Sequence, residues 1–167
     1  ERQAMASQWQ GEKEAVLRTS QEMARKGLVV GTAGNVSTRI GDRGLLAITP
    51  SRKHYNDLEV DDIQVIDFEA EPVEGDQVPS VETLMHVAAY RARPDIRGFV
   101  HTHSLYASVL AVARLELPPL VDELVASVGG TVKVADYAFP STEELAENVA
   151  IALHERNAVL LANHGVV

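Results

Sequence analysis

The spacing of apolar residues predicts four helices. The first covers residues 10–26, where apolar side chains recur at helical spacing among charged ones, and Gly27 follows where a helix end favours positive φ. Ser80 is a suitable N-cap for the second helix, and Pro94 ends it. The predicted helices cover residues 10–26, 81–93, 104–116 and 141–157.

Strand-like segments lie between these helices. Two of them flank the turn "GDRG" at 41–44, which predicts a hairpin within residues 32–51. Further strands are predicted at 61–69, 96–103, 131–137 and 158–167, the last as one buried strand. The acidic stretch "EAEPVEGDQVP" is interpreted as a turn. Because strands and helices alternate, we expect an α/β domain, but the hairpin means that its sheet need not be parallel.

The composition is typical of one globular domain. The chain has 167 residues, of which 46% are hydrophobic and 23% charged, and it shows neither a repeat nor a linker. There is no apolar run of membrane-spanning length, and the polar start "ERQAMASQWQGEKEAV" lacks the layout of a secretion signal, so we expect a cytoplasmic protein without a membrane partner. The chain stops two residues after "NHG", and we expect the natural polypeptide to continue with a C-terminal segment.

Charge and cysteine content narrow the chemistry. A net charge of -9 without a basic stripe argues against a nucleic-acid partner. Arg52 and Lys53 form a small basic group that suffices for one small anion. The absence of cysteine excludes disulfides and thiolate ligands, which leaves any metal ion to imidazole and carboxylate groups.

A pair of histidines is the first candidate for such a site. His101 and His103 stand two positions apart in a predicted strand, so both imidazoles project from the same face. His164 follows the apolar run "AVLLAN", at a strand end, where ligands of α/β sheets gather. Together with Glu82, three imidazoles suit a zinc-like divalent ion.

Each of these residues also has a purely structural interpretation. A lone buried histidine is most often a hydrogen-bonded core residue, and a glutamate in a first helical turn is favoured by the helix dipole. His86 lies one turn after Glu82 on the same face, and we interpret it as a packing residue or as a support for a ligand. His54 and His154 have charged or polar neighbours and are interpreted as surface residues.

Small residues suggest an anion site as well. The turn "GTAGNVST" at 31–38 lets backbone amides approach an anion closely. The segment "ITPS" at 48–51 and the helix start at Ser80 add hydroxyls and free amides. Turn formation and helix capping explain the same residues without a ligand.

These motifs, taken in order, resemble the class II aldolase/adducin superfamily, and most closely its L-fuculose-phosphate aldolase type. The match runs from about residue 12 to the end of the chain. It rests on "GTAGNVSTR", "LLAITPS", "PSVETLMH", "HTHS", "ADYAFPSTEELAENVAIAL" and "LLANHG". The resemblance implies a three-layer α/β/α fold with a central mixed, largely antiparallel sheet.

The resemblance also implies an activity and roles for individual residues. The activity is zinc-dependent cleavage, with another divalent cation possible, of fuculose 1-phosphate or a related deoxy-sugar phosphate to dihydroxyacetone phosphate and an aldehyde. His101, His103 and His164 match the family's zinc ligands. Glu82 matches a fourth ligand that becomes the acid/base when substrate displaces it.

The resemblance also implies residues that bind the substrate phosphate and one that contacts a neighbouring subunit. The phosphate-binding positions of the family match Gly34, Asn35, Ser51 and Ser80. Tyr137 matches a tyrosine that reaches a neighbouring subunit's site as proton donor, which implies a homotetramer with active sites at subunit interfaces.

Two positions depart from the family pattern. Arg52 replaces the usual glycine after "TPS", and Val81 replaces the second serine of "SSE". A guanidinium offers a planar fork of donors to a phosphate, so Arg52 is included among the phosphate-binding candidates, although it can equally point into solvent.

Other functions remain open on the same scaffold. Sugar-phosphate epimerases, dehydratases and decarboxylases share it, but the epimerases usually carry Asp where Glu82 stands and "KPSG" where this chain has "TPSR". A non-catalytic adducin-like interaction domain is the alternative outside enzymes, and such a domain is expected to lose the metal ligands that this chain retains.

Overall fold

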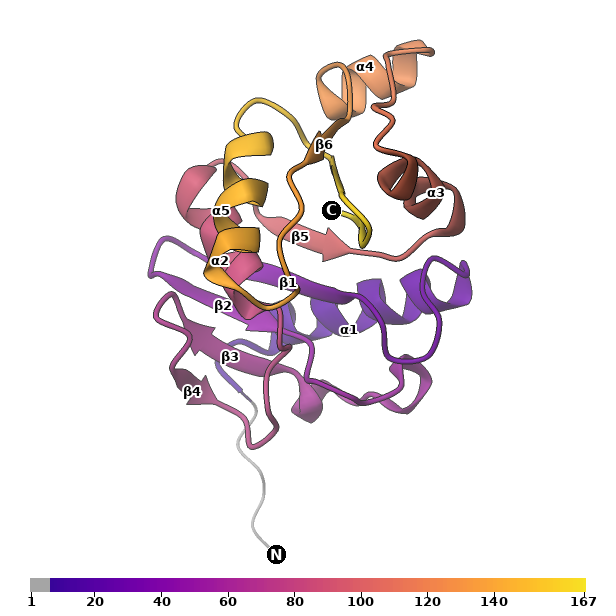
Figure 1. Cartoon of the computed structure of the whole chain (residues 1–167). Helices are drawn as coiled ribbons and strands as arrows, with labels where there is room; N and C mark the ends of the chain where they lie inside the picture. Colours follow the sequence, from indigo (N-terminus) through magenta and orange to yellow (C-terminus); the bar gives the residue numbers. More distant parts are fainter. Residues whose placement is uncertain (1–6) are drawn as a thin grey trace, which may run out of the picture.

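A largely antiparallel sheet lies at the centre of the computed structural model, which describes residues 7–167 (Figure 1). One part of the sheet has the order β4-β3-β2-β1-β5 with every pair antiparallel, and the other has the order β6-β7-β8 with β6 and β7 parallel. The strands are β1 (Asn35–Ile40), β2 (Leu45–Ile48), β3 (Gln64–Asp67), β4 (Pro72–Glu74), β5 (Gly98–His101), β6 (Lys133–Ala135), β7 (Val159–Leu161) and β8 (Gly165–Val166).

The two parts meet at a single bridge. The backbone amide of Thr102 donates to the carbonyl of Val166 at 2.9 Å, and the amide of Val166 donates back at 3.0 Å. This bridge places the end of β5 beside β8, so residues about sixty positions apart in the sequence become neighbours. It is the contact on which the candidate site depends.

Helices cover both faces of the sheet, as the resemblance implies. They are α1 (Gln10–Arg25), α2 (Thr83–Ala92), α3 (Leu105–Ala113), α4 (Asp122–Val128) and α5 (Glu143–Ala152), with short 3-10 turns at Tyr55–Asp57 and Val60–Asp62. One apolar core contains Leu46, Phe99 and Leu161 beneath α2 and α5, while α1 and α3 pack on the opposite face. The three-layer α/β/α class with a mixed, largely antiparallel sheet is therefore confirmed.

The first helix and the hairpin were predicted correctly from the spacing of apolar residues and from the turn sequence. In α1, Val16, Ser20 and Met23 are buried along one face, and Gly27 takes a φ of 68° directly after the helix. The hairpin at 41–44 is also confirmed, because β1 pairs with β2 in antiparallel register across it. Among residues 7–167, no helix combines the length and the apolarity that crossing a bilayer requires.

Two predictions from local composition were wrong. The stretch interpreted as an acidic turn contains β4, a three-residue strand at the sheet edge where a proline costs no ladder hydrogen bond. The run 158–167 is two strands rather than one. It folds back after Leu161 through a turn in which Asn163 takes a φ of 58°, a left-handed conformation that asparagine tolerates.

Element boundaries also differ from the prediction. Ser80 is not the N-cap of α2: the helix begins at Thr83 after Glu82, and the Ser80 hydroxyl instead accepts a hydrogen bond from the amide of Glu82 at 3.3 Å. The helix predicted at 104–116 ends at Ala113, because Leu117 leaves to pair with Val132. The strand predicted at 96–103 ends at His101, and α5 is shorter than 141–157, its N-cap being Thr142. The predicted strands 61–69 and 131–137 are likewise shorter, as β3 and β6.

Candidate active site

Three histidines lie together where the two parts of the sheet meet. His101 is the last residue of β5, His103 follows it, and His164 lies in the turn between β7 and β8. Their ring centroids form a nearly equilateral triangle with sides of 4.8, 4.8 and 5.0 Å. Each ring offers a nitrogen within 4.8 Å of the others, and the Nε2 atoms of His101 and His103 are 3.0 Å apart. The triangle exists because the bridge at Thr102 holds the two segments side by side.

Glu82 completes the cluster from the helix layer that packs on the sheet. It stands at the N-terminal end of α2 and is 7% exposed. Its Oε1 lies 3.2 Å from Nε2 of His164, and its Oε2 lies 3.4 Å from Nε2 of His101. The four side chains that the sequence singled out as metal ligands are thus neighbours in space.

Two glycines make this close approach possible. A Cβ on Gly165 would lie 2.4 Å from the carbonyl oxygen of Thr102 and 3.0 Å from the ring of His103. A Cβ on Gly34 would lie 2.6 Å from the carbonyl oxygen of His101, and Gly34 has a φ of 76°. Both positions therefore require a residue without a side chain.

The surroundings of His101 and His103 favour their neutral forms. Burial lowers the pKa of His101 well below its usual value, and the neighbouring His164 and His103 lower it further. The pKa of His103 is lowered for the same two reasons, burial and then His164. The contact between His101 and Glu82 is therefore not an ion pair, although its length alone would suggest one.

The donor set fits a divalent cation. The Nδ1–H of neutral His101 donates to the carbonyl of Val166 at 3.1 Å, which leaves the lone pair of Nε2 directed at the cluster. Among the described residues, Oε1 of Glu82 finds no hydrogen-bond partner despite complete burial. Converging imidazole lone pairs and a buried carboxylate oxygen are the ligands that zinc and similar ions take.

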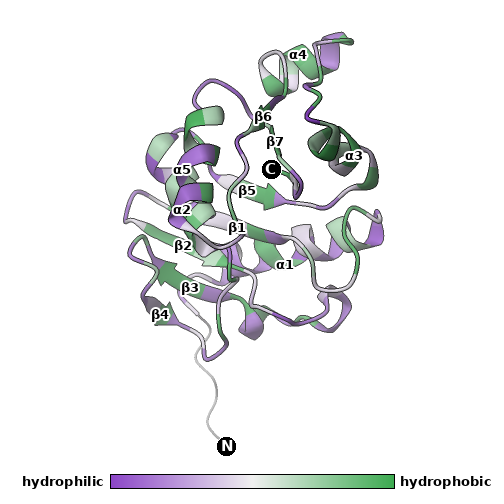
Figure 2. Ribbon diagram, in the orientation of Figure 1, coloured by the Kyte–Doolittle hydropathy of each residue, from purple (hydrophilic) through white to green (hydrophobic). Residues whose placement is uncertain are grey.

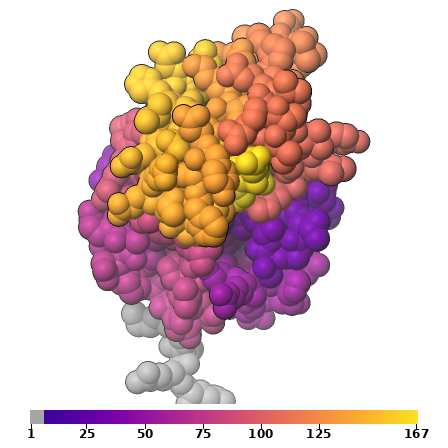
Figure 3. All heavy atoms as spheres, in the orientation of Figure 1, coloured from indigo at the N-terminus to yellow at the C-terminus, as the bar shows by residue number. Residues whose placement is uncertain are grey.

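A pocket of about 450 Å³ opens beside this cluster. In Figure 3 a hollow lies where the C-terminal residues (yellow), the orange segment and the indigo N-terminal region meet. The five phosphate candidates Gly34, Asn35, Ser51, Arg52 and Ser80 all line this pocket, as do Glu82, His103 and His164. The sequence did not single out Thr32, Pro140 and Ser141, which also line it. Thr32 lies within the glycine-rich turn at 31–38, so the small residues of that turn are the signal that points to it.

The other candidates lie elsewhere. Tyr137 is 48% exposed in the loop after β6 and does not line the pocket of its own chain. His54 and His154 are exposed, as predicted. His86 is completely buried against Phe99, with ring centroids 4.4 Å apart, and burial lowers its pKa to about 3.

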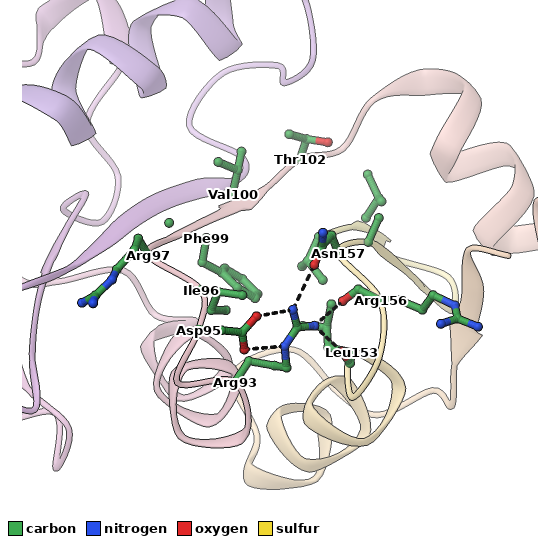
Figure 4. Close-up of a pocket in the computed structure, with 14 residues that line it drawn as sticks. Arg93, Asp95, Ile96, Arg97, Phe99, Val100, Thr102, Leu153, Arg156 and Asn157 are labelled. Carbon is green, nitrogen blue, oxygen red and sulfur yellow. Dashed lines mark hydrogen bonds and ion pairs between the residues drawn. The ribbon is translucent and has the colours of Figure 1, made fainter. Parts of the chain in front are cut away.

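A second pocket, of about 620 Å³, lies between β5 and residues 153–158, which follow α5 (Figure 4). Arg93 dominates it: the guanidinium pairs with both carboxylate oxygens of Asp95 at 2.8 and 2.7 Å. It also donates to the carbonyls of Leu153 and Arg156, which follow α5. Because these contacts fasten α2 to α5 and the candidate residues lie outside this pocket, it is the weaker candidate despite its size.

Comparison with known proteins identifies the family of the chain. The family model described as "Class II Aldolase and Adducin N-terminal domain" matches residues 14–167. The chain is 39% identical over 158 residues to 5-deoxy-D-ribulose 1-phosphate aldolase of Bacillus thuringiensis serovar kurstaki, covering 95% of this chain and 74% of the relative. It is 40% identical over 152 residues to L-fuculose phosphate aldolase of Escherichia coli K12, covering 91% and 69%.

The family also includes other chemistry. An L-ribulose-5-phosphate 4-epimerase of Salmonella paratyphi C is 38% identical over 148 residues, covering 87% of this chain and 60% of the relative. Among solved structures, an L-fuculose 1-phosphate aldolase superimposes with a TM-score of 0.89 at 40% identity, covering 97% of this chain and 75% of that one. The chain therefore belongs to the class II aldolase and adducin family, among its metal-dependent enzymes.

Proposed function

We propose that this protein is a zinc-dependent aldolase that cleaves a ketose 1-phosphate to dihydroxyacetone phosphate and an aldehyde. The substrate is fuculose 1-phosphate or a related deoxy-sugar phosphate. The observation that carries the proposal is the convergence of Glu82 and three imidazoles at the wall of a pocket lined by small, hydroxyl-bearing and cationic residues. The relatives named as aldolases of such substrates support it.

The site residues have two roles, which are to bind the cation and to transfer the proton. His101, His103, His164 and Glu82 would hold the cation. When bound, the cation supplies positive charge beside the substrate oxygens that become negative as the carbon–carbon bond breaks. The substrate hydroxyl loses one proton as the aldehyde carbonyl forms, and the carbanion carbon gains one. Glu82, whose Oε1 has no hydrogen-bond partner among the described residues and faces the site, would take up that proton and pass it to the carbon. Gly34, Ser51 and Ser80 line the part of the pocket where a phosphate would sit.

A product assay tests this proposal against its rivals on the same scaffold. Zinc-loaded protein is incubated with a panel of ketose 1-phosphates, and triose phosphate plus aldehyde is the expected outcome. An epimerised pentose phosphate, a dehydrated sugar or released carbon dioxide would contradict it in favour of an epimerase, dehydratase or decarboxylase. A purified protein without a stoichiometric divalent ion would favour an adducin-like interaction domain.

Arg52 offers a prediction about substrate binding. It lines the pocket in a left-handed conformation, with a φ of 60°, at the position where the family usually has glycine. We expect Arg52→Gly to raise the KM for the phosphorylated ketose roughly tenfold with little change in kcat, as expected for loss of a charge-assisted hydrogen bond to phosphate. Arg52→Lys keeps the positive charge but not the planar pair of donors, so its KM should lie between those of the wild type and Arg52→Gly. An unchanged KM in Arg52→Gly would place the guanidinium in solvent.

We also propose a homotetramer in the cytoplasm with active sites shared between subunits. Tyr137 lies outside the pocket of its own chain and is exposed, as a residue that serves a neighbouring subunit must be. Helix α3 is largely apolar (green in Figure 2). Several apolar side chains of α3 and α4 are exposed to solvent. These are Leu105, Tyr106, Val109, Val112 and Val125. Exposed apolar surface of this kind favours protein contact.

The oligomer is tested by sedimentation. A mass of four chains at micromolar concentration, and a lower kcat for Tyr137→Phe with its mass unchanged, are the expected results. A monomer with full activity would contradict both the tetramer and the role of Tyr137.

A further inference from the structure

A row of buried polar side chains runs from the candidate site into the core. Its members are Glu82, Asn35, His86, Ser37 and Tyr90, and each is 7% exposed or less. Helix α2 supplies His86 and Tyr90 four residues apart, with Glu82 one turn before them, while β1 supplies Asn35 and Ser37 two residues apart. Because side chains four apart on a helix and two apart on a strand share a face, the packing of α2 on β1 interleaves them.

Hydrogen bonds join each member to the next. Nδ2 of Asn35 donates to Oε2 of Glu82 at 2.8 Å, and Oδ1 of Asn35 contacts Nε2 of His86. On the other side of the ring, Nδ1 of His86 lies 2.7 Å from the hydroxyl of Ser37, which lies 2.8 Å from the hydroxyl of Tyr90. The core thus reaches the carboxylate of Glu82 through four consecutive bonds.

The carboxylate fixes the direction of every bond in the row. The amide nitrogen of Asn35 donates to Oε2 of Glu82, which leaves the amide oxygen of Asn35 turned to His86. That oxygen requires a proton on Nε2 of His86, and a neutral ring then accepts at Nδ1 from Ser37. Burial keeps His86 neutral and raises the pKa of Tyr90, so the tyrosine stays a donor to Ser37.

We propose that His86 is a positioning residue, which acts through Asn35 to hold the carboxylate of Glu82 in one orientation. The inference rests on the proposed function of Glu82. With Oε2 held by Asn35, the other oxygen, Oε1, is presented to His164 and the pocket without a competing partner. A buried network in which Asn35, His86 and Ser37 are each bonded on both sides restricts the rotation of its terminal group. The nitrogen and the oxygen of the Asn35 amide are both bonded within the row. A contact between this side chain and the substrate phosphate stays a prediction.

Three variants separate positioning from general destabilisation. His86→Leu removes both bonds of the ring, while His86→Gln keeps a donor for Asn35. Val87→Ala is the matched control, because Val87 is a buried neighbour on α2 that packs in the core and has no part in the row. We expect His86→Leu to lower kcat and zinc affinity about tenfold each with KM unchanged, and His86→Gln to recover part of both. Val87→Ala should lower Tm with kcat and zinc affinity unchanged.

A spectroscopic readout tests the row without turnover. In the zinc-free protein at neutral pH, ¹⁵N NMR should show His86 neutral with its proton on Nε2. The opposite tautomer, a charged ring, or wild-type kcat and zinc affinity in His86→Leu would overturn the inference. If His86→Leu does not fold, His86→Gln and Ser37→Ala carry the same comparison. If the wild type cleaves no ketose 1-phosphate, the proposed function fails, whereas the tautomer and the zinc titration still decide the role of His86.

Discussion

Replacing Glu82 by Gln should lower kcat by about 10² to 10⁴-fold, the usual contribution of a general acid or base. The reason is geometric as well as chemical: the buried carboxylate is held by Asn35 at one oxygen and turned towards the pocket with the other. The amide of Gln keeps the size of the side chain but carries no exchangeable acid proton. The measurement is kcat on the ketose 1-phosphate that the wild type cleaves best, with zinc content determined in the same sample.

The control for this variant is Glu147→Gln. Glu147 is exposed on α5 and lies outside the pocket, so the same charge change there should leave kcat unaffected. Undiminished turnover of Glu82→Gln with zinc bound would reject the acid–base role of Glu82.

Removing His164 should have the second largest effect. Its Nε2 lies 3.2 Å from Glu82, and its ring forms one corner of the histidine triangle. We expect His164→Ala to weaken zinc binding by more than about 100-fold, since loss of a ligand should exceed the 10 to 100-fold typical of residues that only support ligands. The activity of the variant should fall to that of chelator-treated wild type. Added zinc should restore the activity of the chelator-treated wild type. Competition with a chromophoric chelator measures the affinity.

His154→Ala provides the matched comparison, because His154 is exposed and does not belong to the histidine triangle. It should bind zinc as tightly as the wild type. Equal zinc affinity in the two histidine variants would show that the triangle is not the metal site.

Much of this site could be predicted because its residues sit at the ends of strongly patterned segments. His101 follows the apolar stretch of β5, and His164 follows the apolar stretch of β7. What the pattern could not supply was the bridge between Thr102 and Val166, a long-range pairing with no local signal. For the same reason the run 158–167 was interpreted as one strand, although its second half turns back to meet β5.

The buried row behind Glu82 has a sequence signal, which is the spacing of its polar residues. His86 stands one turn after Glu82 in the sequence, and the same spacing continues to Tyr90. Asn35 and Ser37 alternate on the facing strand. Each polar residue alone is unremarkable in a helix or strand. Only the packing of α2 on β1 turns the two periodicities into one hydrogen-bonded path. The edge strand β4 was missed because Pro72 and its acidic neighbours are turn residues by composition.

The central claim is that Glu82, His101, His103 and His164 surround one cation. X-ray absorption spectroscopy of protein loaded with one equivalent of zinc tests it most directly. The account predicts a first shell of nitrogen and oxygen at about 2.0 to 2.2 Å with the outer-shell scattering of three imidazoles, and one imidazole fewer in His164→Ala. Zinc surrounded mainly by water oxygens, or a spectrum that His164→Ala leaves unchanged, would contradict it.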